Sequence, residues 1–464
     1  MHPRDHSQLF AELSTAYAEH SPISARLNEQ AQQYLIDGGS HGLRLLLPFP
    51  PRIAESKGAW LKDVDGHHIL DFWQGHYANI LGHNPKVITE ALTKALEDRF
   101  GLQTGHTDEL AIEVAELLCQ RTGAEQVRFT TSGALATMYA ILLSRAFTGR
   151  NVVMKAGGGW HGGQPWALKG IHYGRVGFQE VESAGLPPSV TESVLVTLYN
   201  DPEKLREQFR AHGDQIACFI LEPFVGVGGF IPVTREFLQT ARDLTHEYGA
   251  VLILDEIIAG FRFRAGNMGA LYGIQPDLTT MGKIVGGGMP VSAVVGRKEL
   301  LQLASREAEQ KVAFSGGTFS AHPASLLAAK VMIRYLVAHE DEIYPRLTEL
   351  GRKARQTIEA AYASEGILVR CTGFGNDVVP DSSMVMPHFP YDDHYDLNLP
   401  HSVQNPEICD VRFRDVVLRV AMLLEDIYTV HGLGSLTTAH GEADIERLGE
   451  ACRQTARRVK AYWT

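Results

Sequence analysis

Two charged residues, Lys283 and Asp255, lie in runs where a charge has little access to water. Lys283 lies in the run LTTMGKIVGGGMP, residues 278–290, and Asp255 ends the apolar run VLILD, residues 251–255. Poor solvation lowers the pKa of an ammonium, so the Lys283 amine can attack an aldehyde. A carboxylate at a strand end can keep a pyridinium nitrogen protonated. The pair predicts pyridoxal phosphate chemistry with both residues catalytic; the alternative is a surface lysine after a turn and an aspartate that caps a helix.

A second group of residues could bind the phosphate of such a cofactor. Ser132, Gly133 and Ala134 follow a predicted strand and open a predicted helix, so free backbone N–H groups and the helix dipole would face an anion. The later run SGGT, residues 315–318, adds the Thr318 hydroxyl and backbone donors. Serine and glycine before a helix usually form only a cap, but their position ahead of the aspartate and the lysine favours phosphate binding. No glycine motif of the dinucleotide-binding type follows an early strand, and no P-loop motif is present in the sequence.

The glycine-rich loop GGGWHGG, residues 157–163, could cover one face of a flat ring. It presents Trp160, whose indole could stack on a pyridine, and His161 beside it as a further cofactor contact. Ile257 lies two residues beyond Asp255, so on an extended segment it would point the same way and pack on the other face. The alternative for Trp160 is an aromatic side chain that fills the core beside a loop.

The elements that must position these residues alternate between β-branched runs and amphipathic helical stretches from about residue 85 onward. Strands are predicted at 127–130, 151–154, 194–197, 216–220, 251–255 and 292–295, and helices at 85–100, 108–121, 135–146 and 235–248. This alternation predicts an α/β fold with a mostly parallel sheet covered on both faces. Ligands of such sheets bind at the carboxyl ends of the strands, where Asp255 and Ser132 both fall.

The two ends of the chain have a different pattern, which predicts a division into 1–77, 78–330 and 331–464. Residues 58–71 form a predicted hairpin with an Asp-Gly turn, and long helical stretches open and close the C-terminal part, the last at 444–463. Between them, residues 375–405 are rich in Pro, Asp, Ser and His. A stretch of this length without regular structure predicts a lid or a disordered loop.

Composition excludes several classes of protein. The chain of 464 residues is 44% hydrophobic and has a net charge of −11, without a basic cluster, so we expect no nucleic-acid partner. It has no apolar stretch of about 18 residues, so we expect no membrane span and a cytoplasmic location. Five cysteines without C-x-x-C spacing predict reduced, mostly buried thiols and no zinc site. The crowded group His388, Asp392, Asp393, His394 and Asp396 lacks metal-ligand spacing, so we expect no metal there.

From about residue 58 onward the chain resembles the class III aminotransferases of pyridoxal phosphate fold type I. The most specific segments are DEIIAGFR, residues 255–262, and PDLTTMGKIVGGGMP, residues 276–290. The likeness is greatest to the branch that holds glutamate-1-semialdehyde aminomutase and D-phenylglycine aminotransferase. It implies a large cofactor-binding domain, a smaller α+β domain from both termini, Lys283 as the Schiff-base lysine, Asp255 as the pyridinium partner and Trp160 as the stacking aromatic. It further implies that Glu222 lies near the cofactor and that Thr318 reaches the phosphate of the neighbouring subunit, in a homodimer with shared sites.

The departures from the family pattern concern the substrate. Relatives commonly have Ser-Gly-Thr-Glu-Ala where this chain has SGALA, residues 132–136, so a hydroxyl and a carboxylate are missing. Relatives also place an arginine after Gly-Gly near the N-terminus to hold a substrate carboxylate. In the stretch GGSHGLR, residues 38–44, this role could fall to Arg44, to His41 or to neither. His76 could touch a substrate acid, although a histidine in a turn is more often structural, and the same holds for His431.

These residues predict an enzyme that forms an external aldimine with a primary amine or amino acid and moves a proton with Lys283 as acid and base. Amino-group transfer or migration is the expected outcome. One alternative is an ammonia-lyase, in which the same carbanion expels a β-substituent, for instance from a hydroxylated aminophosphonate. The other is a pyridoxal-binding protein without catalysis, which the presence of Lys283 and Asp255 disfavours because binding alone needs neither residue.

Overall fold

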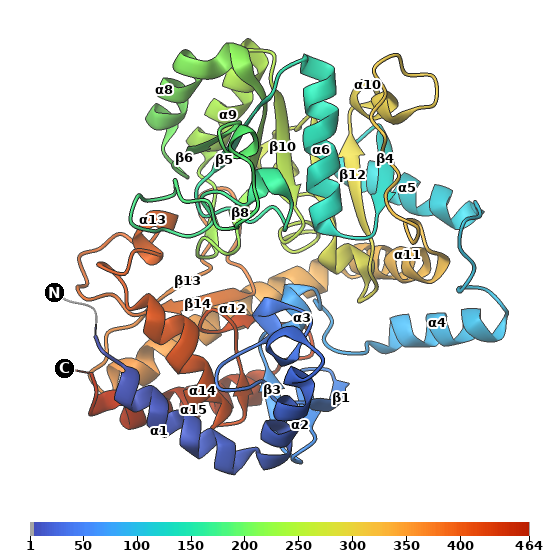
Figure 1. Cartoon of the computed structure of the whole chain (residues 1–464). Helices are drawn as coiled ribbons and strands as arrows, with labels where there is room; N and C mark the ends of the chain where they lie inside the picture. The colour runs from blue at the N-terminus through green and yellow to red at the C-terminus, as the bar shows by residue number, and fades with distance from the viewer. Residues whose placement is uncertain (1–3, 464) are drawn as a thin grey trace.

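A seven-stranded sheet runs through the upper part of the molecule in Figure 1, a computed structural model that describes residues 4–463. In spatial order its strands are β4 (Gln126–Thr130), β12 (Ser292–Gly296), β11 (Leu278–Met281), β10 (Val251–Glu256), β7 (Ile216–Leu221), β5 (Val152–Ala156) and β6 (Val194–Thr197). All neighbouring pairs are parallel except those that β12 makes with β4 and β11. The predicted mostly parallel sheet is confirmed, and β11 is the one strand of it absent from the prediction.

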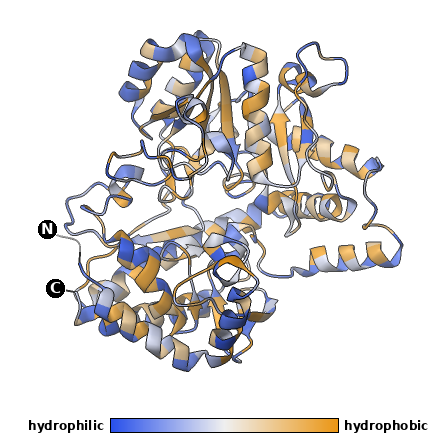
Figure 2. Ribbon diagram, viewed as in Figure 1, coloured by the Kyte–Doolittle hydropathy of each residue, from blue (hydrophilic) through white to orange (hydrophobic). Residues whose placement is uncertain are grey.

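Helices cover both faces of this sheet. The covering helices are α5 (Glu109–Thr122), α6 (Gly133–Thr148), α8 (Pro202–His212), α9 (Arg235–Glu247) and α11 (Pro323–Ala338). Along β10, Val251 and Ile253 pack in the cluster that contains α6, whereas Leu252 and Leu254 pack in the cluster that contains α8 and α9. Every residue of β7 and β10 is buried, which explains why β7 and the first four residues of β10 are apolar without a break; β10 appears largely orange in Figure 2.

Segments from both ends of the chain meet in the lower part of Figure 1. One small sheet joins β1 (Ile53–Lys57), β2 (Trp60–Asp63), β3 (His68–Asp71) and β15 (Ile427–Tyr428), and another joins β13 (Arg370–Thr372), β14 (Met384–His388) and β16 (Gly434–Ser435). The predicted hairpin is therefore confirmed as β2 and β3. Three long helices, α1 (Ser7–His20), α12 (Glu340–Ala363) and α15 (Glu442–Lys460), and the short helix α14 (Leu418–Leu423) cover these sheets.

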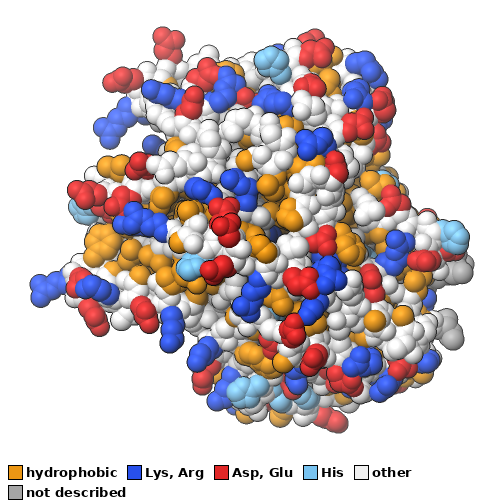
Figure 3. Space-filling view, turned by 180° about the vertical axis from the view of Figure 1, so that it is seen from behind, with side chains coloured by type: hydrophobic (Ala, Val, Ile, Leu, Met, Phe, Trp, Pro, Cys, Tyr) orange, Lys and Arg blue, Asp and Glu red, His pale blue; other side chains and the backbone are white. Residues whose placement is uncertain are grey.

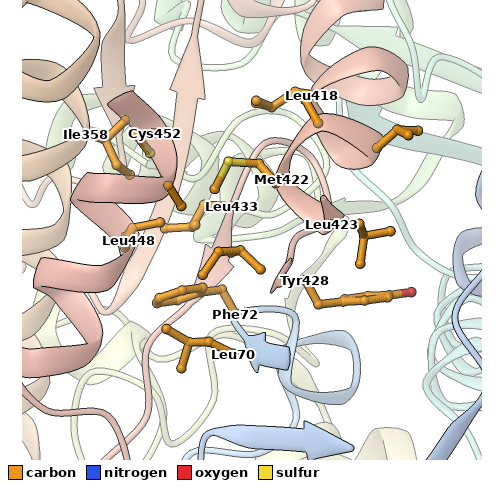
Figure 4. Packing of buried hydrophobic residues seen from close by; sticks show 14 of the residues in the cluster. Leu70, Phe72, Ile358, Leu418, Met422, Leu423, Tyr428, Leu433, Leu448 and Cys452 are labelled. Atoms are coloured by element: carbon orange, nitrogen blue, oxygen red, sulfur yellow. The ribbon is translucent and has the colours of Figure 1, made fainter. Parts of the chain in front are cut away.

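A single apolar core ties the N-terminal and C-terminal segments together. Leu70 and Phe72, which belong to β3 and the residue after it, pack in the same cluster as Met422, Leu448 and Cys452 (Figure 4). The contact between α12 and α15 belongs to this core as well. The two termini thus fold as one unit, which the predicted small domain requires, while the exact boundaries at residues 77 and 330 remain a prediction.

The remaining elements are short or peripheral. They are α2 (Pro22–Gln32), α3 (Gln74–Tyr77), α4 (Lys86–Glu97), α7 (Pro188–Thr191), α10 (Lys298–Leu301), α13 (Pro400–Val403), β8 (Phe224–Val225) and β9 (Ile231–Pro232). Within residues 4–463, no helix is both long enough and apolar enough to span a membrane. Four of the five cysteines are buried and none is in a disulfide, as predicted.

The stretch 375–405 is not the irregular loop that its composition predicts. Residues Met384–His388 form β14, which is buried at every position and pairs with β13 and β16. The apolar run MVM accounts for this strand. Because Pro, Asp, Ser and His surround it, the average composition of the stretch does not indicate a strand. The residues on either side of β14 are irregular, and those around the exposed pair His394 and Asp392 lie at the surface.

Candidate active site

The predicted site residues gather around one cavity of about 310 Å³ at the carboxyl ends of the central strands. Ten of the predicted residues line it: His41, His76, Gly133, Ala134, Trp160, His161, Glu222, Asp255, Ile257 and Lys283. Three do not: Ser132 caps α6, Arg44 lines a neighbouring cavity of about 540 Å³, and Thr318 is exposed. The sheet topology brings together most of these residues, which lie far apart in the sequence, and the N-terminal segments add His41 and His76.

Asp255 ends β10 with both carboxylate oxygens engaged. One oxygen lies 2.7 Å from Nδ1 of His161, and the other accepts hydrogen bonds from the Thr280 hydroxyl at 2.8 Å and from the Ile257 N–H at 3.2 Å. Thr280 can reach it because β10 and β11 are parallel neighbours with these two residues in register. Asp255 is only 2% exposed, so this network fixes the position of a buried negative charge at the cavity wall.

Glu222 ties the aromatic loop to the sheet. It follows β7, and its two oxygens accept hydrogen bonds from the backbone N–H groups of Trp160 at 2.8 Å and Gly226 at 3.0 Å. Burial raises the pKa of this carboxyl to about 8, and the negative charge of Asp255 acts in the same direction. Glu222 thus holds the Trp160 backbone at the cavity.

Lys283 follows β11 in an unusual backbone conformation. Its φ is 49°, in the left-handed region that a residue with a Cβ adopts only at a cost. A Cβ on the preceding residue, Gly282, would lie 2.6 Å from the Ser292 hydroxyl, so glycine leaves that side chain in its place. Burial lowers the pKa of the Lys283 amine, while the charges of Asp255 and Glu222 oppose that effect. The turn therefore presents a poorly solvated amine to the cavity.

Lys155, in β5, organises the loop that carries Trp160 and His161. Its ammonium is fully buried and donates hydrogen bonds to three backbone carbonyls, those of Gly159 at 2.9 Å, Ala167 at 3.1 Å and Lys169 at 2.9 Å. Burial lowers its pKa to about 8. Because the three acceptors flank the aromatic pair, Lys155 joins both ends of the loop to the sheet.

The residues around the cavity fit a phosphorylated pyridine. Gly133 and Ala134 lie on the first turn of α6, where unpaired N–H groups and the helix dipole favour an anion. The backbone there is tightly packed, since a Cβ on Gly162 would lie 2.5 Å from Cα of Ala134. Nε2 of His161 is buried without a hydrogen-bond partner among the described residues, so the cavity wall retains an unused polar group.

Several residues of the site were not predicted. Thr280, Thr137, Ser292 and Lys155 are polar side chains on or beside the central strands, and Ile258 and Leu43 complete the cavity wall. The β-branched run LTTM was a signal for β11 and hence for Thr280. Lys155 had a signal too, a lysine inside the strand VVMKA, although its three carbonyl partners follow only from the path of the loop.

One His and Asp cluster lies away from this cavity. His20, His67 and Asp426 bring three possible ligand atoms within 4.8 Å of one another. The two imidazole rings stack at 3.9 Å with an interplanar angle of 18°, and stacked rings cannot both direct a lone pair at one ion. We assign no metal to this cluster.

Comparison with known proteins agrees with this geometry. The profile of the family "Aminotransferase class-III" matches residues 47–376. The chain belongs to this family. A glutamate-1-semialdehyde 2,1-aminomutase of Thermoplasma volcanium is 36% identical over 327 residues, which are 70% of this chain and 77% of the relative.

Solved structures of similar proteins support the same assignment. An omega-transaminase from Sphaerobacter thermophilus superposes with a TM-score of 0.84 at 31% identity, over 94% of this chain and 98% of that one. A transaminase with PLP bound superposes with a TM-score of 0.81 at 27% identity, over 95% and 98% of the two chains. The predicted family, fold, type of enzyme and pyridoxal phosphate cofactor are thus confirmed.

The arrangement around Lys155 leads to a first prediction for this class III enzyme. Lys155→Met keeps the shape of the side chain but leaves three buried carbonyls without their donor, so we expect a loss of about 2–5 kcal/mol in the free energy of unfolding. Urea denaturation measures it. Lys204→Met, which removes only a surface lysine paired with Glu207, is the control. A Lys155→Met protein as stable as the parent would contradict the role of this lysine.

A second prediction concerns His76, whose pKa burial lowers to about 3. Below pH 6.5 the unfolded chain binds a proton at this residue that the folded chain does not, so the folded state loses stability as the pH falls. His76→Gln should therefore lose less stability than the parent between pH 6.5 and pH 5, by about 1 kcal/mol for a partly exposed ring. The measurement is urea denaturation at both pH values. His394→Gln, on the exposed segment, should not reduce the loss.

Proposed function

We propose that this class III enzyme transfers or shifts an amino group with Lys283 as its proton carrier and Asp255 as the partner of the cofactor's ring nitrogen. The observation that carries this proposal is that Asp255 lies near the end of β10, Lys283 follows the adjacent parallel strand β11, and both line the same cavity. A protein that only binds pyridoxal phosphate would need neither a poorly solvated amine nor a buried carboxylate at that place.

When bound, pyridoxal phosphate withdraws electrons from the carbon next to the substrate nitrogen. The chain's own residues do the rest. Burial lowers the pKa of the Lys283 amine and so favours the neutral form, in which Nζ accepts a proton and returns it at a neighbouring atom. Asp255, held by His161 and Thr280, keeps its negative charge directed at the ring position without reorganisation.

Other residues position the cofactor and enclose it. Trp160 and Ile257 line the cavity from the loop and from the segment after β10, and we infer that they enclose the two faces of the ring. Gly133 and Ala134 hold the phosphate at the start of α6. With Glu222 fixing the Trp160 backbone, these contacts bind the cofactor independently of Lys283.

We also propose a homodimer in which Thr318 reaches the phosphate of the partner's site. Thr318 is exposed and lies outside the cavity of its own chain, although the neighbouring Gly317 approaches Thr131 next to the α6 N-terminus. The next residue, Phe319, is a large exposed apolar side chain, and Leu96 and Leu102 are exposed as well. Figure 3 shows that apolar side chains do reach the surface between charged ones.

The cytoplasmic location remains a prediction.

The proton-transfer proposal predicts separate losses for the two catalytic residues. Lys283→Ala should abolish turnover and the absorbance of the lysine-linked cofactor while retaining much of the cofactor affinity. Asp255→Asn should retain that linkage but slow turnover by at least about 100-fold, because a neutral amide no longer stabilises the charged ring. Turnover is followed with an amine panel, with and without a 2-oxo acid, together with free ammonia, since release of ammonia would indicate elimination.

Borohydride reduction and peptide mapping provide the decisive check. If the reduced cofactor is attached to another lysine, such as the buried Lys155, the assignment of Lys283 is wrong. Near-normal turnover of Asp255→Asn would likewise refute the role of the carboxylate.

The dimer proposal predicts that cofactor binding and subunit association are linked. Thr318→Ala should weaken both, with a loss of about 1–3 kcal/mol for a hydrogen bond to a charged group. Sedimentation of the apo and holo forms measures association, and Thr15→Ala, an exposed threonine on α1, is the control. A monomer that binds its cofactor fully would refute the shared site.

A further inference from the structure

Four consecutive residues beside the cavity adopt a left-handed backbone. In α3, the φ angles are 48° at Gln74, 60° at Gly75, 60° at His76 and 64° at Tyr77. Only glycine adopts this region without cost, and each of the other three residues pays roughly 1–2 kcal/mol for it. Such a turn persists only if the surrounding structure enforces it, and strain of this kind concentrates where a side chain must be placed for function.

A network of buried polar contacts enforces the turn. The Asp71 carboxylate accepts hydrogen bonds from the backbone N–H groups of Trp73 at 2.8 Å and Gln74 at 3.0 Å, and it lies 2.7 Å from Nε2 of His83. The Gln74 side chain donates to the Asp71 carbonyl at 2.9 Å. On the far side of the turn, the buried Arg262 donates to the carbonyl of Tyr77.

The turn places His76 in the wall of the active-site cavity. Its ring packs between two others, with centroid distances of 4.3 Å to Trp73 and 4.6 Å to His41, which lines the same cavity. Nε2 of His76 is buried and has no hydrogen-bond partner among the residues that the structure describes. An imidazole nitrogen that a strained turn holds in place and that lacks a hydrogen-bond partner indicates a missing ligand.

The surroundings of His76 are basic. The groups that act on it most strongly after burial are His41, Lys283, Arg44 and His431, and all of them lower its pKa. Burial also lowers the pKa of His41, helped by Arg44.

The acids near His76 are already engaged. Asp415 is paired with Arg414 at 2.8 Å and lies 3.5 Å from His431. Asp255 and Glu222 line the cavity, but each has both oxygens occupied by the contacts described above. No carboxylate among the described residues is therefore left to satisfy the His76 imidazole.

We propose that His76 and His41 bind an oxyanion at the far end of the substrate, so that the substrate is a primary amine that also carries a carboxylate or phosphonate group. The proposal rests on the proposed function and specifies its substrate class. Nε2–H of His76 donates to the anion, His41 provides a second donor, and Arg44 adds positive charge from the neighbouring cavity. Imidazoles can bind either a carboxylate or a phosphonate, because they lack the paired N–H groups with which arginine matches the geometry of a carboxylate.

Binding of the anion should be coupled to protonation. A negative charge beside His76 favours the imidazolium form and reverses the effect of the surrounding cations on its pKa. Substrate binding then takes up a proton, and the apparent affinity for anionic amines should rise as the pH falls from 8 to 6. The titratable and charged groups that face His76 and enter this balance are His41, Arg44, Lys283 and His431 with its partner Asp415.

The test compares three amines of similar size with the holoenzyme. 3-Aminopropanoate carries a carboxylate, 2-aminoethylphosphonate carries a phosphonate, and n-butylamine carries neither. The rate at which each converts the lysine-linked cofactor gives kcat/KM, at pH 6 and pH 8. We expect at least one anionic amine to exceed n-butylamine by 10-fold or more, and this ratio to be larger at pH 6.

Variants separate the proposal from a structural role of the turn. His76→Asn and His41→Asn should each reduce the ratio of anionic to neutral amine about 10-fold, mainly through KM, and remove its pH dependence. His394→Asn, on the exposed segment, is the matched control and should leave the ratio as it is. A purely structural role of His76 would lower all three rates together and leave the ratio unchanged.

The outcomes are distinguishable. The two anionic amines decide between carboxylate and phosphonate. A parent enzyme that converts n-butylamine as well as both anionic amines overturns the anion site but leaves the proposed function standing. If no amine in a wider panel converts the cofactor, the proposed function itself fails. An unchanged ratio in both histidine variants refutes their role.

Discussion

The site depends on the burial of charged groups at the carboxyl ends of a parallel sheet. Glu222, Asp255 and Lys283 end or follow the neighbouring strands β7, β10 and β11, so the register of the sheet brings two carboxylates and an amine to one cavity. Burying such groups is costly unless each has partners. The hydrogen bonds from Thr280, His161 and the backbone around Trp160 provide them, and they also fix the geometry that catalysis requires.

Much of the central sheet and of the cofactor side of the cavity could be predicted, because the sequence patterns that indicate them are local. The apolar runs of β7 and β10 indicate buried parallel strands. Asp255 and Lys283, which lie next to apolar runs, indicate pyridoxal phosphate chemistry. The strand β11 was missed although LTTM has the β-branched composition of a strand, and with it the hydroxyl of Thr280. Lys155 could not have been assigned its role, since its three carbonyl partners come from the fold of the loop 157–169.

The substrate half was harder to predict, for physical reasons. His41 and His76 reach the cavity from N-terminal segments that pack with C-terminal ones in a shared core, and no local periodicity encodes that packing. The left-handed turn 74–77 contradicts the preference of three of its residues, so local propensity argues against the structure that forms. Likewise, β14 was hidden by the polar composition around it, because three apolar residues suffice for a strand that tertiary contacts bury.

The two halves of the site therefore differ in how they can change. The cofactor half is fixed by a sheet whose buried strands tolerate little variation, because a shift of register would separate Asp255 from Thr280 and from Lys283. The half that we propose for substrate binding consists of side chains on turns, where a substitution alters recognition without disturbing the sheet. The hydrogen bonds that join Asp71, at the end of β3, to the turn hold His76 in a conformation that its own backbone disfavours. The packing of the two termini thus supports the proposed anion site, whereas the sheet supports the cofactor site.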